Sequence, residues 1–160
     1  MNFRRWKSIV RDKTVPLGTV DMPVARRVVA ARDYLDPTAN GGQVKVKKEL
    51  SIRYMHSFLD QCFVLERLDE GSYLCRLFSA GSVDLFDEDW TNQIVDRDGP
   101  YGNWPPLYDR VIDRGQPEYH RNRLELIDGS TLLAETGIFP VSTQCGNIKY
   151  VVSVFDIIDE

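Results

Sequence analysis

Few side chains in this sequence have the residue types and spacing that catalysis or metal binding requires. The three cysteines, Cys62, Cys75 and Cys145, lie far apart and form no Cys-x-x-Cys pair, so we predict neither a disulfide framework nor a zinc site. No glycine-rich phosphate loop is present either, because Gly41 and Gly42 lack the Lys and the Ser or Thr that would have to come after them.

Acidic residues gather in one place, at Asp84, Asp87, Glu88 and Asp89. The cluster lacks the glycine and the terminal glutamate of a calcium loop, so we interpret it as a solvated surface and predict no metal site. No set of Ser, His and Asp shows the spacing of a catalytic triad. Positive evidence for catalysis is absent from the sequence, and we predict that the protein is not an enzyme and has no catalytic residues.

The segment from Tyr73 to Thr91 combines a strand, a small-residue corner and a short helix. Tyr73 to Phe78 is rich in aromatic and branched residues, which is typical of a strand. Ala80, Gly81 and Ser82 break the strand, and an apolar cluster then lies beside the acidic residues. These residues predict a strand that turns sharply into a helix.

The flanking sequence supplies the other elements of a sheet with helices. A first strand at Cys62–Glu66 is joined to the second by the turn Asp69–Gly71. A helix is predicted at 107–112, where apolar residues share one face, with Pro105 and Pro106 in its first turn and Gly115 at its end. Three further strands are predicted at Tyr119–Ile127, Leu132–Val141 and Ile148–Ile158.

This order of elements resembles that of PAS domains, and in particular the short stand-alone bacterial group whose second strand ends in Arg-Leu-x-x-x-Gly-Ser/Thr. The matching residues are Arg76, Leu77, Gly81, Ser82, Leu85, Phe86, Asp89, Trp90 and Thr91, with Gly115 and Pro117 before the third strand. The resemblance covers roughly Arg26 to Ile158. It implies an α+β fold, a PAS-like five-stranded antiparallel sheet with helices on one face and an N-terminal helical extension.

The charge of the chain is unevenly distributed. Residues 1–50 hold 11 Lys and Arg against 5 Asp and Glu, and residues 51–160 hold 9 against 19, so a front end of +6 precedes a body of −10. We therefore divide the chain into a basic N-terminal arm (1–25) and a single PAS-like domain (26–160) that includes the leading helix. The acidic body argues against nucleic-acid binding, which needs clustered Lys and Arg.

Two interpretations of the basic arm are open. Phe3, Trp6, Ile9 and Val10 alternate with basic residues, so residues 3–11 could form an amphipathic helix on an anionic membrane or a partner. A flexible or self-docking arm is the favoured interpretation, because the segment is short and Pro16 and Gly18 interrupt the residues after it.

The leading helix is predicted from Arg26 to the Asp36-Pro37 step. The last two strands carry apolar residues on both faces, as shown by Phe139 and Val152, whereas a solvent-facing sheet surface would be mostly polar. The second face must therefore be covered, either by the N-terminal segment or by a second copy of the protein. We predict a homodimer through the leading helix and this face.

A ligand pocket in a PAS-like fold would lie between the sheet and the helices that come after the second strand. Alternation along the strands turns inward the residues that flank Arg76, Arg123 and Glu125. The resulting candidate lining is Cys75, Leu77, Val83, Phe86, Tyr108, Val111, Leu124 and Leu126. Such a lining is almost wholly apolar, so any ligand should be small and hydrophobic, unless these residues simply fill the core.

Flavin and haem are both disfavoured as cofactors, and the cofactor remains unknown. Flavin-binding photosensors of the same superfamily carry Asn-Cys-Arg-Phe-Leu-Gln at the start of a helix. Here Cys75 comes after Leu74 inside a predicted strand and no Gln comes after Phe78, so a buried structural thiol is the better interpretation. The two histidines, His56 and His120, lie outside the helix that carries the haem ligand in haem-binding relatives.

The resemblance implies a sensory or protein-interaction module that binds a small apolar ligand or a partner and signals through a separate output protein. A ligand-free dimeric adaptor is the alternative, and a small enzyme or carrier is a third. No run of residues is long enough to span a bilayer and the charged start lacks the apolar stretch of a signal peptide, so we expect a cytoplasmic protein.

Overall fold

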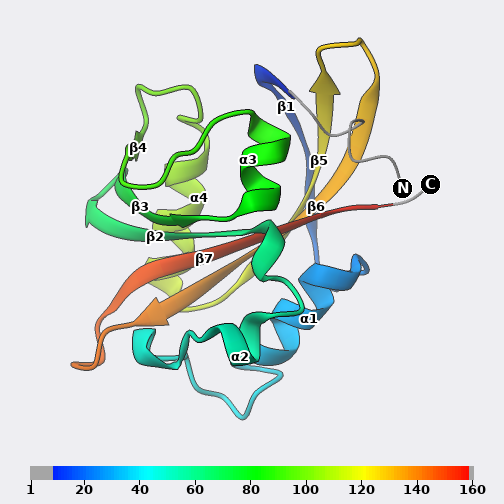
Figure 1. The fold of residues 1–160 in the computed structure, drawn as a ribbon. Coiled ribbons are helices and arrows are strands. Elements are labelled where there is room, and N and C mark those ends of the chain that lie inside the picture. The colour runs from blue at the N-terminus through cyan, green and yellow to red at the C-terminus, as the bar shows by residue number, and fades with distance from the viewer. Residues whose placement is uncertain (1–8, 159–160) are drawn as a thin grey trace.

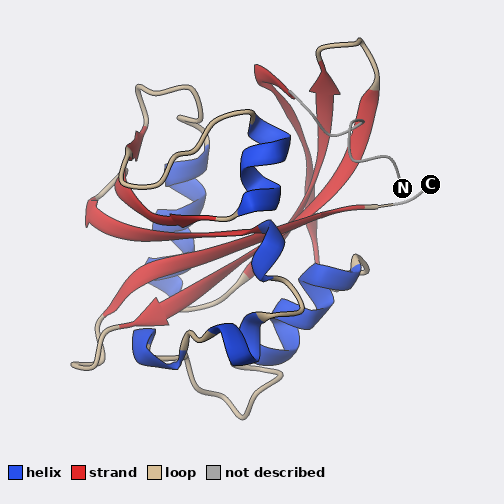
Figure 2. Ribbon diagram, in the orientation of Figure 1, coloured by secondary structure: helices blue, strands red, loops and turns tan. Residues whose placement is uncertain are grey.

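A computed structural model describes residues 9–158 of the chain, and their side chains from Thr14 onward. One antiparallel sheet of seven strands, in the order β1-β5-β6-β7-β2-β3-β4, forms the body of the α+β fold (Figures 1 and 2). The strands are β1 (Ile9–Val20), β2 (Cys62–Asp69), β3 (Ser72–Phe78), β4 (Ile94–Asp96), β5 (Glu118–Leu126), β6 (Thr131–Ser142) and β7 (Ile148–Ile157). The helices are α1 (Arg26–Leu35), α2 (Ile52–Met55), α3 (Ala80–Phe86) and α4 (Trp104–Arg114), with 3-10 turns η2 (Lys47–Glu49) and η3 (Leu59–Gln61).

The predicted order of elements is confirmed from β2 to β7. β2 and β3 form the expected hairpin, α3 and α4 come next, and β5, β6 and β7 complete the sheet. β7 lies in the middle and pairs with β6 on one side and with β2 on the other. The ends of α4 are those the sequence predicts: prolines stand in its first turn, and Gly115 ends it with a left-handed φ of 65°. This arrangement is consistent with a PAS-like fold.

The predicted number of five strands is wrong, because two further strands extend the sheet. β4 is a short strand on the outer edge of β3. β1 pairs with β5 along the other edge, where it lies beside that strand in Figure 1. Pro16 and Gly18, which are expected to interrupt regular structure, lie within β1 because an irregularity in the pairing between them accommodates both.

β1 also corrects the interpretation of the basic arm. Ile9 to Arg11, the end of the predicted amphipathic helix, belong to the strand. Phe3 and Trp6 lie outside the described residues, so membrane contact by this segment stays a prediction. None of the described helices is long and apolar enough to cross a membrane.

Helices lie on both faces of the sheet: those that come after the second strand occupy one face, as predicted, and the N-terminal helical extension lies on the other. α3 and α4 pack on the inner face, and α1 and α2 cover the outer face, below the sheet in Figure 1. The predicted leading helix is confirmed: α1 ends at Leu35, before Asp36 and Pro37. Phe139 and Val152 on the outer face are fully buried within the chain. The N-terminal segment therefore covers this face, which removes the observation that motivated the homodimer.

Two buried carboxylates on the outer face hold the start of α1. Glu135 on β6 is fully buried and accepts hydrogen bonds from the backbone N–H groups of Val24 and Ala25, both at 2.8 Å. Asp156 on β7, its cross-strand neighbour, accepts one from the N–H of Arg27 at 3.0 Å. The first N–H groups of a helix have no partner within the helix, and carboxylates there also interact favourably with its dipole.

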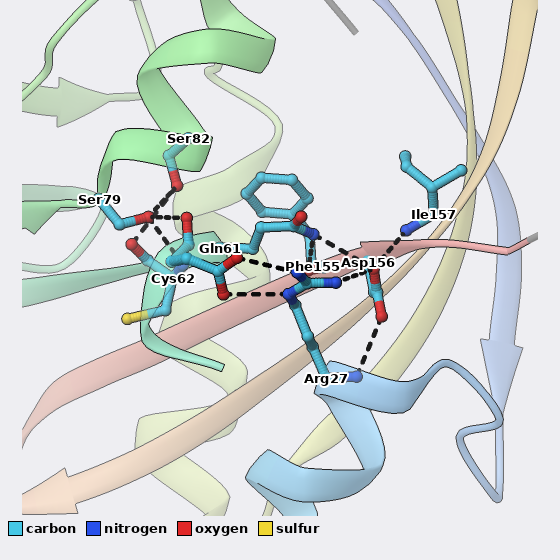
Figure 3. Close-up of polar contacts among 9 residues, drawn as sticks. Arg27, Gln61, Cys62, Ser79, Ser82, Phe155, Asp156 and Ile157 are labelled. Atoms are coloured by element: carbon cyan, nitrogen blue, oxygen red, sulfur yellow. Dashed lines mark hydrogen bonds and ion pairs between the residues drawn. The ribbon is translucent and has the colours of Figure 1, made fainter. Parts of the chain in front are cut away.

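The same network extends to the start of α3 (Figure 3). The guanidinium of Arg27 donates to Asp156 and to Asp60, and the amide of Gln61 donates to Asp156 and to the Phe155 carbonyl. The hydroxyl of Ser79, directly before α3, donates to the carbonyl of Asp60. The turn η3 therefore links the helix on the outer face to a helix on the inner face.

Candidate functional site

A cavity of about 160 Å³ lies between the inner face of the sheet and the helices α3 and α4. Its apolar lining consists of Pro16, Phe63, Leu85, Phe86, Trp104, Leu107, Leu124, Ala134, Ile138 and Phe155. Its polar lining consists of Thr14, Asn103, Tyr108, His120, Asn122, Thr136 and Ser153. The cavity is thus mainly apolar, with several neutral groups that can form hydrogen bonds.

Aromatic rings form one wall of the cavity. Phe63 stacks on Trp104 with ring centroids 5.6 Å apart. Phe86 meets Trp104 and Phe155 edge-on, at 5.5 Å and 6.0 Å. Stacked and edge-to-face geometries are the favourable ones for aromatic pairs, so this wall is a well-packed surface for a flat apolar group.

The strands supply the polar wall. Side chains two residues apart on a strand share a face, and His120, Asn122 and Leu124 of β5 therefore all point toward the helices. Thr14 and Pro16 of β1 continue this surface because β1 pairs with β5, with Thr14 opposite Leu124 and Pro16 opposite Asn122. β1 therefore completes the cavity at the edge of the sheet.

His120 belongs to a chain of charged contacts that leads out of the cavity. Its Nε2 lies 2.9 Å from Oε1 of Glu118, and Arg110 on α4 donates to both oxygens of that carboxylate, from Nε at 2.5 Å and from Nη2 at 2.6 Å. Burial opposes ionisation of Glu118, but the hydrogen bonds from Arg110 and His120 outweigh it and hold the pKa of this carboxyl below its usual value. Arg110 and Glu118 also line an open, polar groove of about 500 Å³.

Tyr108 on α4 contributes a buried hydroxyl to the lining. Burial raises the pKa of Tyr108 well above its ordinary value, which a hydrogen bond to Ser153 on β7 only partly offsets. The Tyr108 ring meets the Tyr73 ring edge-on at 5.3 Å, and the Tyr73 hydroxyl donates to the buried Asp109 at 2.6 Å. These contacts join α4 to β3, and the burial of Tyr108 favours its neutral form.

The structure places the predicted lining residues in three groups. Phe86, Tyr108 and Leu124 line the cavity. Cys75, Val83, Val111 and Leu126 belong to the same inner core without lining it. Leu77 packs with the outer-face cluster, so its predicted inward direction is wrong. An irregularity in the pairing of β2 with β3, where Val64 faces Leu77 but Leu65 faces Cys75, inserts an extra residue at Arg76 and reverses the alternation.

Most of the remaining lining was missed by sequence reasoning. His120 and Asn122 obey the same alternation that identified Leu124, so extending it along β5 would have found them. Trp104 could have been found one helical turn before Tyr108 on α4. Thr14 and Pro16 depend on the pairing of β1 with a distant strand, for which the sequence carries no local signal.

The cysteines differ sharply in environment. Cys62 and Cys75 are buried, and desolvation raises the pKa of each thiol to about 12, whereas Cys145 is exposed. Cys75 lies within the strand β3, as the sequence predicts, and its thiol contacts the Leu77 carbonyl at 3.4 Å. Among the described residues, no group of three or more His, Cys, Asp or Glu side chains is arranged to hold a metal ion.

Comparison with known proteins gives similar structures but no similar sequences. Neither a protein-family model nor a curated protein matches the chain. A light-oxygen-voltage (LOV) domain studied with a flavin analogue is 16% identical, with a TM-score of 0.46 over 63% of this chain and 78% of its own. The light state of the blue-light photoreceptor Aureochrome1 LOV is 16% identical, with a TM-score of 0.48 over 70% of this chain and 91% of its own.

An RNA-binding LOV receptor is also 16% identical, with a TM-score of 0.48 over 91% of this chain and 37% of its own. These neighbours are LOV domains, a subgroup of the PAS family. The PAS-like description of the present fold depends on its own order of elements and on the central position of β7 between β6 and β2.

Proposed function

We propose that the chain is a PAS-like sensory module that binds a small, largely apolar molecule in the inner cavity and signals through a separate output protein. The observation that carries this proposal is the cavity itself. Protein interiors are close-packed, and an apolar space of this size beside aromatic rings leaves dispersion contacts unmade that a ligand would supply.

The size of the cavity limits the ligand. An apolar cavity of about 150 Å³ in another protein binds benzene, so the 160 Å³ available here suits a molecule of about one ring. A tricyclic flavin or a dinucleotide is much larger than one ring, and the described residues of the lining include no cluster of cations for phosphate groups. Binding would alter the populations of two conformations that differ in how α3 and α4 pack on the sheet.

Native mass spectrometry of the purified protein, and then calorimetric titration with benzene and phenol, tests this proposal. A ligand that co-purifies, or saturable binding of either probe, is the expected result. Ala134→Leu adds volume inside the cavity and should abolish binding without unfolding the protein, whereas Ala30→Leu adds the same volume on α1, outside the cavity, and should leave binding intact.

The absence of any bound molecule and of any probe binding would overturn the proposed ligand site and favour the ligand-free adaptor. The homodimer and the separate output protein remain predictions, which light scattering and affinity capture with a tagged chain would test.

A further inference from the structure

The polar end of the cavity contains a histidine whose two ring nitrogens have different environments. Nε2 of His120 faces the Glu118 carboxylate at 2.9 Å. An ionised carboxylate only accepts hydrogen bonds, and Arg110, which donates to both of its oxygens, stabilises the ionised form. Nε2 therefore carries the hydrogen.

The other nitrogen, Nδ1, is then an acceptor in the neutral ring. No hydrogen bond reaches it from any of the described residues, although His120 is only 8% exposed and lines the cavity. Because His120 lines the cavity and its Nε2 is taken up by Glu118, Nδ1 is available to a donor supplied from within the cavity. Asn122, two residues along the same strand, lies on the same side.

The lining also constrains the charge of a ligand. Among the described residues that line the cavity, none is Asp, Glu, Lys or Arg. An anion in the cavity would lie unfavourably close to the Glu118 carboxylate. A cation would have no carboxylate to pair with, because the described lining contains none and Glu118 is already paired with Arg110. Burying either ion in such an apolar site is unfavourable, so a neutral ligand is favoured.

We propose that the cavity selects a neutral, single-ring molecule with one hydrogen-bond donor, a phenol-like compound, whose ring packs against Phe63, Phe86 and Trp104 and whose donor binds Nδ1 of His120. This inference rests on the proposed function and names the class of ligand for the same cavity. The tautomer of His120 determines which ligand group is recognised. As an acceptor, Nδ1 can bind an O–H or N–H donor but cannot form a hydrogen bond with an ether oxygen.

Titration with three probes at pH 8, where an imidazole is ordinarily neutral, tests the proposal. Phenol should bind about tenfold more tightly than methoxybenzene, which has the ring and the oxygen but no donor, and more tightly than benzene. His120→Leu should bring the ratio of phenol affinity to benzene affinity close to one. Circular dichroism and thermal melting of the variant establish that it remains folded.

Nitrogen NMR of the imidazole rings gives a second readout that does not depend on a variant. The chain has two histidines, and His56 is the internal reference because its Nδ1 lies 3.0 Å from the Arg53 carbonyl oxygen, which can only accept. His56 and His120 should therefore show opposite tautomers. Phenol should shift the Nδ1 signal of His120 and leave His56 unchanged.

The outcomes separate the two proposals. Equal binding of all three probes would overturn the donor-selective site and leave the cavity as a sensor of apolar molecules. Retention of the phenol preference by His120→Leu would also overturn the assignment to His120. Failure of every probe to bind would overturn the ligand site itself and this inference with it.

Discussion

The two faces of the sheet differ in how they satisfy their polar groups. On the outer face, Glu135 and Asp156 are buried and accept hydrogen bonds from the backbone at the start of α1. On the inner face, aromatic rings surround a cavity, and Nδ1 of His120 has no hydrogen-bond partner among the described residues. The outer face is thus completed by the chain itself, whereas the inner face has both space and hydrogen-bonding capacity left for another molecule.

The largest expected effect on stability comes from removing Glu135, the carboxylate that accepts hydrogen bonds from the backbone just before α1. Glu135→Leu should lower the free energy of unfolding by about 3 kcal/mol, because the N–H groups of Val24 and Ala25 and the Arg121 guanidinium lose a buried partner. Glu135→Gln keeps an acceptor oxygen and should lose about 1 kcal/mol. Urea unfolding measures both, and equal stability of Glu135→Leu and the wild type would contradict the described role of the outer face.

A matched pair of substitutions compares the packing of the two faces directly. Ala31→Leu, on the fully buried side of α1, should cost about 2 kcal/mol because the outer face has no room for it. Ala134→Leu, in the cavity, should instead raise stability by about 0.5 kcal/mol because it fills empty space. Thermal and urea unfolding give both values, and a large loss for Ala134→Leu would mean that the inner face is as tightly packed as the outer one.

A third prediction concerns Gly81, at the junction of the two faces. A Cβ atom on Gly81 would collide with the backbone carbonyl oxygen of Asp60 in η3, so Gly81→Ala should cost about 2 kcal/mol through displacement of α3 from that turn. Gly99→Ala is the control, because its Cβ would have only ordinary contacts. An unchanged melting temperature for Gly81→Ala would show that α3 can move away from η3 at little cost.

Low pH should reduce the stability of the folded protein through protonation of Glu118, which stands on β5. Its pKa is lowered in the folded state, so the stabilisation it provides is complete above the ordinary glutamate pKa of about 4.3 and is lost as the pH falls toward the lowered value. Glu118→Gln should therefore show a shallower loss of stability below about pH 4 than the wild type. The control is Glu125→Gln on the same strand, because Glu125 forms no ion pair with any of the described residues. Identical pH profiles for Glu118→Gln and the wild type would contradict the prediction.

The smallest expected effect is a difference in reactivity between the two buried thiols and the exposed one. An aromatic disulfide reagent at pH 8 should modify Cys145 quickly and leave Cys62 and Cys75, whose pKa values are raised to about 12, unmodified until the protein unfolds. Cys145→Ser should then show no fast reaction. Rapid modification of Cys75 in the native protein would indicate that the inner face opens readily.

The parts of the fold that the sequence predicts are those with local signals. The Asp36-Pro37 step, the prolines of α4, Gly115 and the alternating strands each specify their element through nearby residues. β1 lacked such a signal, because Pro16 and Gly18 disfavour a strand locally and only pairing with β5, more than a hundred residues away, makes one. The inward direction predicted for the Leu77 side chain was wrong for a similar reason, because the irregularity at Arg76 becomes visible only once β2 and β3 are paired.

For the candidate site, alternation correctly turned Leu124 inward and helical spacing correctly selected Phe86 and Tyr108. The polar residues were missed because an apolar lining was expected, although His120 and Asn122 obey the same alternation. The contacts among Arg110, Glu118 and His120 join a helix to a strand, and their geometry could not be read from spacing alone.

The central position of β7 has a consequence for how the protein is made. The strands that flank it, β2 and β6, are synthesised earlier but do not pair with each other, and β7 joins them only after residues 148–157 have left the ribosome. We therefore expect the β2–β3 hairpin and the β5–β6 hairpin to form during synthesis as separate halves, each with an unpaired edge. Such edges invite association with other chains, so we expect the nascent protein to need chaperone protection until its last strand closes the sheet.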